Sequence, residues 1–268
     1  MTDEPPQGFQ MSGRRAFLEI AIVLGLIAIV VVVLLALVKA GAGVLANYVP
    51  TSFDRTLGDQ AGRAVEATSS PCTDPGPQKY VESVAAPLVR SLGDKRWDFR
   101  FIVVENDEIN AFALPGGFVT VNMGLLSNAE SGEEVAAVLA HELQHVVCRH
   151  GTRRMLRQLG TSVAFAALFG SPDVAVPASV VRDFLSNAYD RSEESEADAR
   201  GLTLLSQAGA DPSGMATFFA RLEKTSLTPP AIISTHPDPG DRAEKAMQAA
   251  KGAKPTLTLP SPKGLRCK

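Results

Sequence analysis

His141-Glu142-Leu143-Gln144-His145 decides both the fold and the chemistry predicted for this 268-residue chain. On an α-helix, residues four apart lie on one face, so both imidazoles can reach a single metal ion. Neutral imidazole suits zinc, and Glu142 can take a proton from zinc-bound water. Residues 132–140 favour a helix, because acidic residues open them and no proline or internal glycine interrupts them. His150 points away from this helix face, so we interpret it as structural.

A catalytic zinc typically has three protein ligands, and residues 189–201 offer candidates for the third. This run is polar and compatible with a helix, on which Glu194 and Asp198 share a face. One carboxylate could bind the metal while the other accepts a hydrogen bond from a zinc-bound histidine. On chemistry alone Glu193 and Glu196 compete with Glu194, and a solvated helix face with mixed charges is the alternative for the whole run.

Further segments extend this pattern along the chain. They are Asn110–Gly117 with Gly124–Leu126, His141–His150, Glu194–Asp198, and Ser234–Pro239 with Arg242. In this order they resemble the gluzincin family of the CAAX prenyl protease. That family includes the mitochondrial overlapping-activity metalloprotease and bacterial periplasmic protease-chaperones. The resemblance runs from about Tyr80 to Ala250.

The resemblance implies specific roles for the site residues. It implies His141, His145 and Glu194 as the ligands of one zinc ion per chain, with Glu142 as the catalytic base. It also implies Asp198 as the hydrogen-bond partner of a ligand histidine. Only the family's Glu-x-x-x-Asp spacing selects Glu194 over its acidic neighbours.

The apolar run from Ile20 to Val38 predicts a membrane-spanning helix. It carries no charge, and 19 residues at 1.5 Å each span roughly 28 Å, about the thickness of a bilayer core. A cleaved signal peptide is the alternative, although its apolar region would be shorter. Arg14 and Arg15 precede the run while Lys39 and Arg55 follow it, so the basic flanks are nearly balanced. We place the N-terminus in the cytosol, as in the periplasmic branch of the family.

The remaining pattern predicts an α+β fold, in which a small sheet lies beside a mostly helical zincin-type body. Strands are expected at Phe99–Val104 and Phe118–Asn122, and helices at Lys79–Leu92 and from Pro212 onward. The predicted divisions are a cytosolic tail (1–15), a transmembrane anchor (16–39), a juxtamembrane connector (40–78) that could hold a short helix, a metallopeptidase domain (79–250) and a flexible tail (251–268).

Charge and cysteine content constrain the partners less tightly. A net charge of −3 gives no electrostatic basis for binding nucleic acid. Cys72, Cys148 and Cys267 have no disulfide-framework spacing, and they do not assign a compartment. The apolar stretch Val163–Phe169 is too short to span a membrane, so we expect it in the core.

Two further site predictions concern the substrate and the resting enzyme. If Phe118, Val119, Thr120, Val121 and Asn122 form an edge strand, an extended substrate could add to it through main-chain hydrogen bonds. An ordinary core strand is the alternative. His236, stiffened by the prolines that follow it, could stabilise an oxyanion or cap the metal in a resting state. A merely structural role is the alternative for His236.

These patterns favour a membrane-anchored zinc endopeptidase that hydrolyses misfolded or unassembled envelope proteins. We expect it in the inner membrane as a single-pass protein, with its catalytic domain on the periplasmic side. Its expected partners are protein or peptide substrates, and a homo-oligomer or an envelope complex is possible. The alternative is a chaperone or assembly factor with little turnover. Glu142 favours the enzyme, because a pure binding module has no need of a base.

Overall fold

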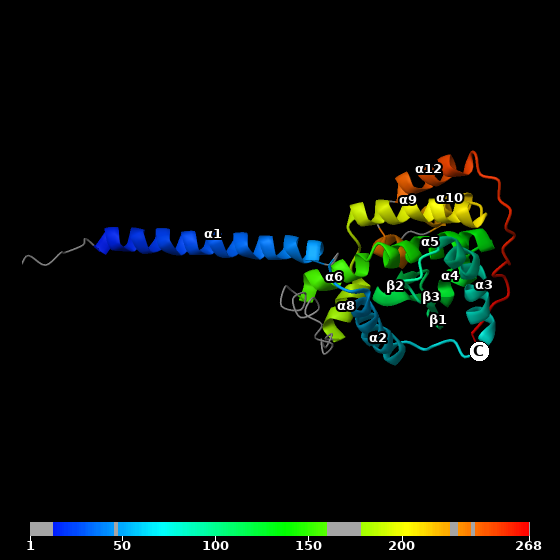
Figure 1. Cartoon of the computed structure of the whole chain (residues 1–268), viewed down its shortest axis with the longest axis horizontal. Helices are drawn as coiled ribbons and strands as arrows, with labels where there is room; N and C mark the ends of the chain where they lie inside the picture. The colour runs from blue at the N-terminus through cyan, green and yellow to red at the C-terminus, as the bar shows by residue number, and fades with distance from the viewer. Residues whose placement is uncertain (1–12, 46–47, 160–177, 226–229, 237–238, 268) are drawn as a thin grey trace, which may run out of the picture.

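The structure is a computed structural model that describes residues 13–45, 48–159, 178–225, 230–236 and 239–267. A small sheet lies beside a mostly helical body, and helix α1 (Gly13–Leu45) extends away from both (Figure 1). The α+β class predicted from the sequence is therefore confirmed. The stretch Val163–Phe169 lies outside the described residues. The other helices are α2 (Thr51–Thr68), α3 (Pro75–Leu92), α4 (Met123–Asn128), α5 (Gly132–Val147), α6 (His150–Leu159), α8 (Ala178–Ser186), α9 (Arg191–Ala208), α10 (Ser213–Thr225), α11 (Ala231–Thr235) and α12 (Pro239–Ala250).

The three-stranded sheet has the order β1-β3-β2, from β1 (Arg100–Val104), β2 (Ala111–Ala113) and β3 (Phe118–Asn122). β1 pairs with β3 in parallel, and β2 pairs with β3 antiparallel. The short 3₁₀ turn η1 (Pro115–Gly117) joins β2 to β3. β3 thus lies in the centre, and all its residues are buried. Of the two alternatives for Phe118–Asn122, the edge strand is wrong and the core strand is correct, because neighbouring strands occupy both of its edges.

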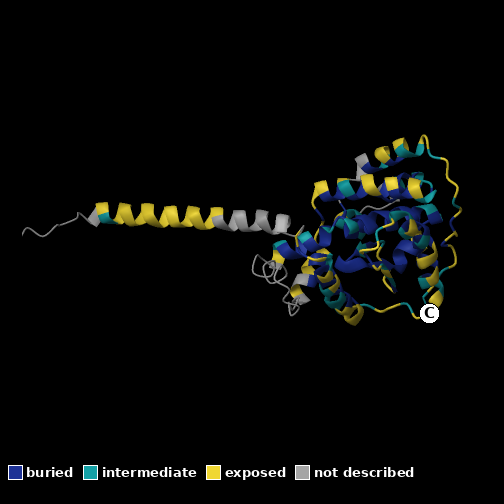
Figure 2. Cartoon of the chain, in the orientation of Figure 1, coloured by how far each residue is buried: buried dark blue, intermediate teal, exposed yellow. Residues whose placement is uncertain are grey.

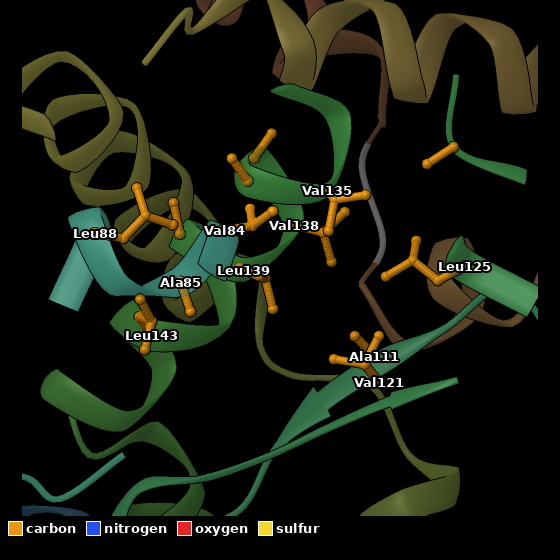
Figure 3. Close-up of a cluster of buried hydrophobic side chains, with 14 of the residues drawn as sticks. Val84, Ala85, Leu88, Ala111, Val121, Leu125, Val135, Val138, Leu139 and Leu143 are labelled. Atoms are coloured by element: carbon orange, nitrogen blue, oxygen red, sulfur yellow. The ribbon is translucent and has the colours of Figure 1, made fainter. Parts of the chain in front are cut away.

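Helix α5 is the centre of the body. Helices α3, α9 and α10 pack around it, and β2 contacts it from the sheet. Its Leu139 and Leu143 lie in one buried cluster with Leu88 of α3 and Val121 of β3 (Figure 3). Full burial of a leucine side chain contributes about 2 kcal/mol, so several such residues hold this helix firmly in place. The histidines that α5 carries are therefore mounted on a rigid element.

Local signals define both ends of α5. The Ser131 hydroxyl accepts a hydrogen bond from the Glu134 backbone N–H at 3.3 Å, as an N-terminal cap does. Glu133 and Glu134 in the first turn interact favourably with the helix dipole. At the other end, Arg149 adopts a φ of 58° and breaks the helix before α6 begins. This left-handed conformation is unusual for a residue with a side chain, so it needs support from its surroundings.

That support comes from α2, within the segment expected to be a connector. Asp54 of α2 is fully buried, and the Arg149 guanidinium donates to it from Nη2 at 2.6 Å and from Nε at 3.1 Å. Gly58 allows α2 to lie directly on η1, because a Cβ atom there would collide with the Pro115 carbonyl oxygen. α2 has 18 residues, so residues 40–78 contain a longer and more deeply packed helix than the short one anticipated.

The C-terminal segment is also tied to the body. The Thr256 backbone N–H donates to the Gly209 carbonyl at 2.9 Å, and a disulfide joins Cys267 to Cys72. Cys148 remains a free, buried thiol. The sequence did not indicate this pairing, because the bonded cysteines lie 195 residues apart and their spacing matches no framework. Residues 251–267 are thus held at several points, which their basic and proline-bearing composition did not predict.

Helix α1 contains the apolar run that was predicted to span a membrane. Its segment Arg15–Val33 has a mean hydropathy of 3.0, is long enough to cross a membrane, and is not buried against the rest of the chain. Figure 2 shows the described part of this helix as mostly exposed, beside a body whose interior is buried. So large an exposed apolar surface is unfavourable in water and favourable in lipid. The structure therefore supports a membrane-spanning role for α1.

Candidate metal centre

The candidate metal centre lies where α5 packs against α9, the two helices that carry the predicted motifs. α5 presents His141 and His145, and the first turn of α9 presents Glu194. His236 follows α11 directly and reaches the same place. All four side chains are buried. The centre therefore combines residues from three separate elements.

Nitrogen and oxygen atoms of these four side chains converge. His141 Nε2 lies 2.9 Å from His145 Nε2 and 3.4 Å from Glu194 Oε2. His236 Nδ1 lies 3.1 Å from His141 Nε2 and 3.0 Å from Glu194 Oε1. One ligand atom from each residue lies within 4.8 Å of all the others. The structure thus brings the three predicted ligands together and adds His236 to them.

This set of donors fits a zinc ion. Two imidazole nitrogens and one carboxylate are a usual ligand set for a catalytic zinc. Glu142, next to them on α5, is fully buried, and among the described residues its carboxylate has only weak polar contacts, such as His236 Nε2 at 3.4 Å from Oε1. Burying a carboxylate with such weak compensation is costly, so a further polar or cationic group beside it is favourable. His141, His145 and Glu194 could hold the ion there, beside Glu142.

Asp198 and Arg242 connect the ligands to one another. His141 Nδ1 donates to Asp198 Oδ1 at 2.8 Å. Arg242 of α12 donates from Nε to Asp198 Oδ2 and from Nη2 to Glu194 Oε2, each at 2.7 Å. The contact between Asp198 and a candidate ligand histidine agrees with the sequence-based expectation, whereas Arg242 was expected only as part of a family segment. The available signal was a basic residue shortly after the His-Pro segment.

Burial and neighbouring charges set the proton affinities in the centre. Burial alone would raise the pKa of Glu194 and of Asp198. His236, His141 and His145 outweigh it at Glu194, and His141 and Arg242 outweigh it at Asp198, so both pKa values lie below their usual range. Burial raises the pKa of Glu142, which has the weaker attractive contacts. Burial lowers the pKa of His145. The two partnered carboxylates are therefore ionised, whereas Glu142 has an increased affinity for a proton.

The sheet edge beside the centre belongs to β2. In the antiparallel pair of β2 and β3, residues that hydrogen-bond to the partner strand alternate with residues that do not. The Leu114 N–H donates to the Phe118 carbonyl, so the N–H and C=O of the preceding residue, Ala113, point away from β3. The Ala113 N–H contributes to the pKa of Glu142 by favouring its charged form, and the Ala113 carbonyl accepts from the Tyr189 hydroxyl at 3.5 Å. The strand that faces the centre is therefore β2, rather than the predicted strand at 118–122.

Two side chains support His145 from behind. The Tyr189 ring stacks on the His145 imidazole, with centroids 4.0 Å apart and planes 20° apart. His150 lies outside the group of four, but its Nδ1 is 3.0 Å from His145 Nδ1. The expectation that His150 points away from the ligand histidines is wrong. It assumed a helix that continues through residue 150, whereas the chain breaks at Arg149 and returns His150 to His145.

Comparison with known proteins gives a consistent result. The profile of peptidase family M48 matches residues 75–250. The beta-barrel assembly-enhancing protease of Yersinia pestis is 31% identical over 225 residues, which cover 78% of this chain and 46% of that protein. The mitochondrial metalloendopeptidase OMA1 of Arabidopsis thaliana is 37% identical over a region that covers 55% of this chain and 31% of the Arabidopsis protein. Metalloprotease LoiP of Escherichia coli (strain K12) is 27% identical over a region that covers 71% of this chain and 77% of LoiP. The chain spans about half the length of the beta-barrel assembly-enhancing proteases that it matches.

Proposed function

The chain belongs to peptidase family M48, and from this premise we propose that it is a membrane-anchored zinc endopeptidase. The observation that carries the proposal is the convergence of His141, His145 and Glu194 beside the buried carboxylate of Glu142. In this assignment the first three residues hold one zinc ion per chain. Asp198 keeps His141 turned with Nε2 toward the metal. α1 anchors the protein in the membrane.

The proposed reaction is hydrolysis of a peptide bond. Zinc bound at this centre would lower the pKa of water and polarise the scissile carbonyl. Glu142 takes the proton from the attacking water and passes it to the leaving amine. Its raised pKa suits this role, because the residue must hold the proton between the two transfers. An extended substrate that adds to β2 would place its main chain next to Glu142.

His236 is proposed to close the centre in the resting enzyme. Its Nδ1 lies among the ligand atoms, and its Nε2 lies 3.4 Å from Glu142 Oε1. The imidazole therefore occupies the space between the metal ligands and the base, where the attacking water must be. Substrate hydrolysis then requires His236 to leave this place. A gate of this kind suits a protease that acts on accessible chains.

The proposed setting is the inner membrane, with the catalytic domain on the periplasmic side. The disulfide between Cys72 and Cys267 supports this side, because such bonds persist in oxidising compartments and are rare in the cytosol. The names of the beta-barrel assembly-enhancing proteases support substrates among misfolded or unassembled envelope proteins. The placement of His236 over the base also keeps the low-turnover chaperone as the second candidate.

The variant Glu142→Gln tests the mechanism. It removes the base and keeps the size of the side chain, so cleavage of an unfolded model protein should fall by at least roughly 10²-fold. Zinc content of the full-length protein in detergent should stay at wild-type level. Glu130→Gln is the matched control, since Glu130 lies outside the centre with a largely exposed side chain. Wild-type cleavage by Glu142→Gln contradicts the mechanism, and a wild-type protein that binds unfolded chains without cleaving them favours the chaperone.

A further inference from the structure

We propose that His150 and Glu196 are positioning residues for His145, which they orient through a relay of hydrogen bonds. The inference rests on the proposed metal site. Asp198 accepts a hydrogen bond from His141 Nδ1, whereas no carboxylate in the described part of the chain does the same for His145 Nδ1. Among the residues that the structure describes, the side-chain atom within hydrogen-bond distance of His145 Nδ1 is His150 Nδ1, at 3.0 Å. His150 Nε2 lies in turn 3.3 Å from Glu196 Oε2.

The chemistry of the relay fixes the proton on each ring. A histidine that binds a metal through Nε2 is neutral and carries its proton on Nδ1, so His145 is the donor toward His150. His150 must accept this bond with an unprotonated Nδ1, which leaves its own proton on Nε2. That proton points to Glu196, which accepts it. Each hydrogen bond therefore has one donor and one acceptor, and the charge of Glu196 favours this set of tautomers.

The fold places His150 for this purpose. His150 is fully buried, so water does not compete for its Nδ1. The left-handed backbone at Arg149 sends the chain back toward His145, and Asp54 of α2 holds the Arg149 side chain. Residues from α6 and α9 thus meet behind one imidazole of α5, and α2 holds the turn that brings them there. A merely space-filling residue at position 150 would need none of this hydrogen-bonding geometry.

A separate metal site is the competing interpretation. Ligand atoms of Cys148, His150 and Glu196 also lie within 4.8 Å of one another. However, the Arg200 guanidinium is 3.0 Å from the other Glu196 oxygen, which disfavours a cation there. Burial raises the pKa of the Cys148 thiol to about 11, so it is a poor ligand. The relay explains both nitrogens of His150, whereas a metal would use one.

Zinc affinity of the full-length protein in detergent tests the relay, measured by competition with a chromophoric chelator. His150→Phe keeps a ring and removes the acceptor, so zinc should bind roughly 10–100-fold more weakly. His150→Asn places an oxygen near the position of Nδ1, and it should recover most of that loss. Glu196→Gln keeps an acceptor without the charge, and it should cause a smaller loss. Arg200→Gln is the matched control, because it changes only the outer partner of Glu196.

The outcomes separate the relay from its alternatives. Wild-type affinity in both His150→Phe and Glu196→Gln would overturn the relay, provided that the metal-free variants unfold at the wild-type temperature. Equal losses in His150→Phe and His150→Asn would also overturn it, because the ring rather than the acceptor would then matter. Two zinc ions per wild-type chain, one of them lost in Cys148→Ser, would show a separate metal site instead. A wild-type protein that binds no zinc would contradict the proposed function itself.

Discussion

Three glutamates stand close together at the start of α9, and their partners distinguish them. Glu193 lies 3.2 Å from Arg157, and Glu196 lies 3.0 Å from Arg200. Glu194 instead faces the two histidines of α5, and it also contacts His236 and Arg242. Each carboxylate therefore has a distinct environment, although the three residues are chemically identical in the sequence.

We expect Glu194→Ala to lose zinc, because a catalytic zinc site with one of its three protein ligands removed binds the ion much more weakly. His141→Ala and His145→Ala should behave in the same way. Zinc content after dialysis against a chelator, measured by plasma mass spectrometry, checks this expectation. Glu193→Ala is the control, and it should retain about one zinc per chain. Loss of zinc from Glu193→Ala with retention in Glu194→Ala would show that the third ligand is misassigned.

His236→Ala should speed the cleavage of an unfolded protein while zinc content stays unchanged. The reason is that the imidazole lies between the ligands and Glu142, where it excludes the attacking water. Initial rates on an unfolded model substrate provide the measurement. If His236 stabilises the oxyanion instead, the same variant should be slower by up to roughly 10²–10³-fold. An unchanged rate would mean that His236 is only structural.

Residue roles could be predicted from sequence where they depend on one helix, and not where they depend on how helices meet. The spacing of His141 and His145 places both on one face, so a local period is enough. Arg242 acts only because α12 folds back and brings its guanidinium to α9. No local pattern contains that information.

Among the elements, the strands show the same difference: the residues of a strand could be predicted from local sequence, but its place in the sheet could not. β-branched and aromatic residues predicted β3 at 118–122, and the structure has a strand with these bounds. Its central position follows from the parallel pairing with β1, which is a non-local contact. The length and packing of helix α2 were not predicted, because its residues are polar on average. Phe53 and Leu57 nevertheless bury a narrow apolar face of this helix. The order of strands and the docking of such a helix depend on tertiary contacts.

At this scale we predict that α2 stabilises the peptidase body through Asp54. Removing one partner of a buried ion pair typically costs about 3–5 kcal/mol, because the other charge stays buried without compensation. Asp54→Ala should therefore lower the free energy of unfolding by about that amount, measured by urea denaturation of the full-length protein in detergent.

Asp59 provides the matched control on the same helix. Its side chain is 41% exposed and pairs with Arg100, which is 46% exposed. An exposed pair contributes about 0–1 kcal/mol, so Asp59→Ala should change the stability little. Equal effects of the two substitutions would contradict the assignment of α2 to the packed body.

At the scale of the whole molecule, the anchor and the disulfide together bear on which side of the membrane the body occupies. Basic residues at the two ends of the apolar run are nearly balanced, so the charge rule decides little. The disulfide links the chain ahead of β1 to the C-terminal segment, and α1 precedes both of these segments. Because the bond persists only in an oxidising compartment, its presence in cells would place the body outside the cytosol.

Counting free thiols in cells tests this orientation. The chain has three cysteines, of which Cys148 alone is free in the structure. Protein denatured without reduction should therefore take one maleimide-polyethylene glycol label, and reduced protein should take three. Cys72→Ser should take two labels without reduction, since it frees Cys267. Three labels on unreduced wild-type protein would place the body on the reducing side of the membrane and reverse the proposed orientation. The reason is that two cysteines which the fold holds next to each other form a disulfide in an oxidising compartment.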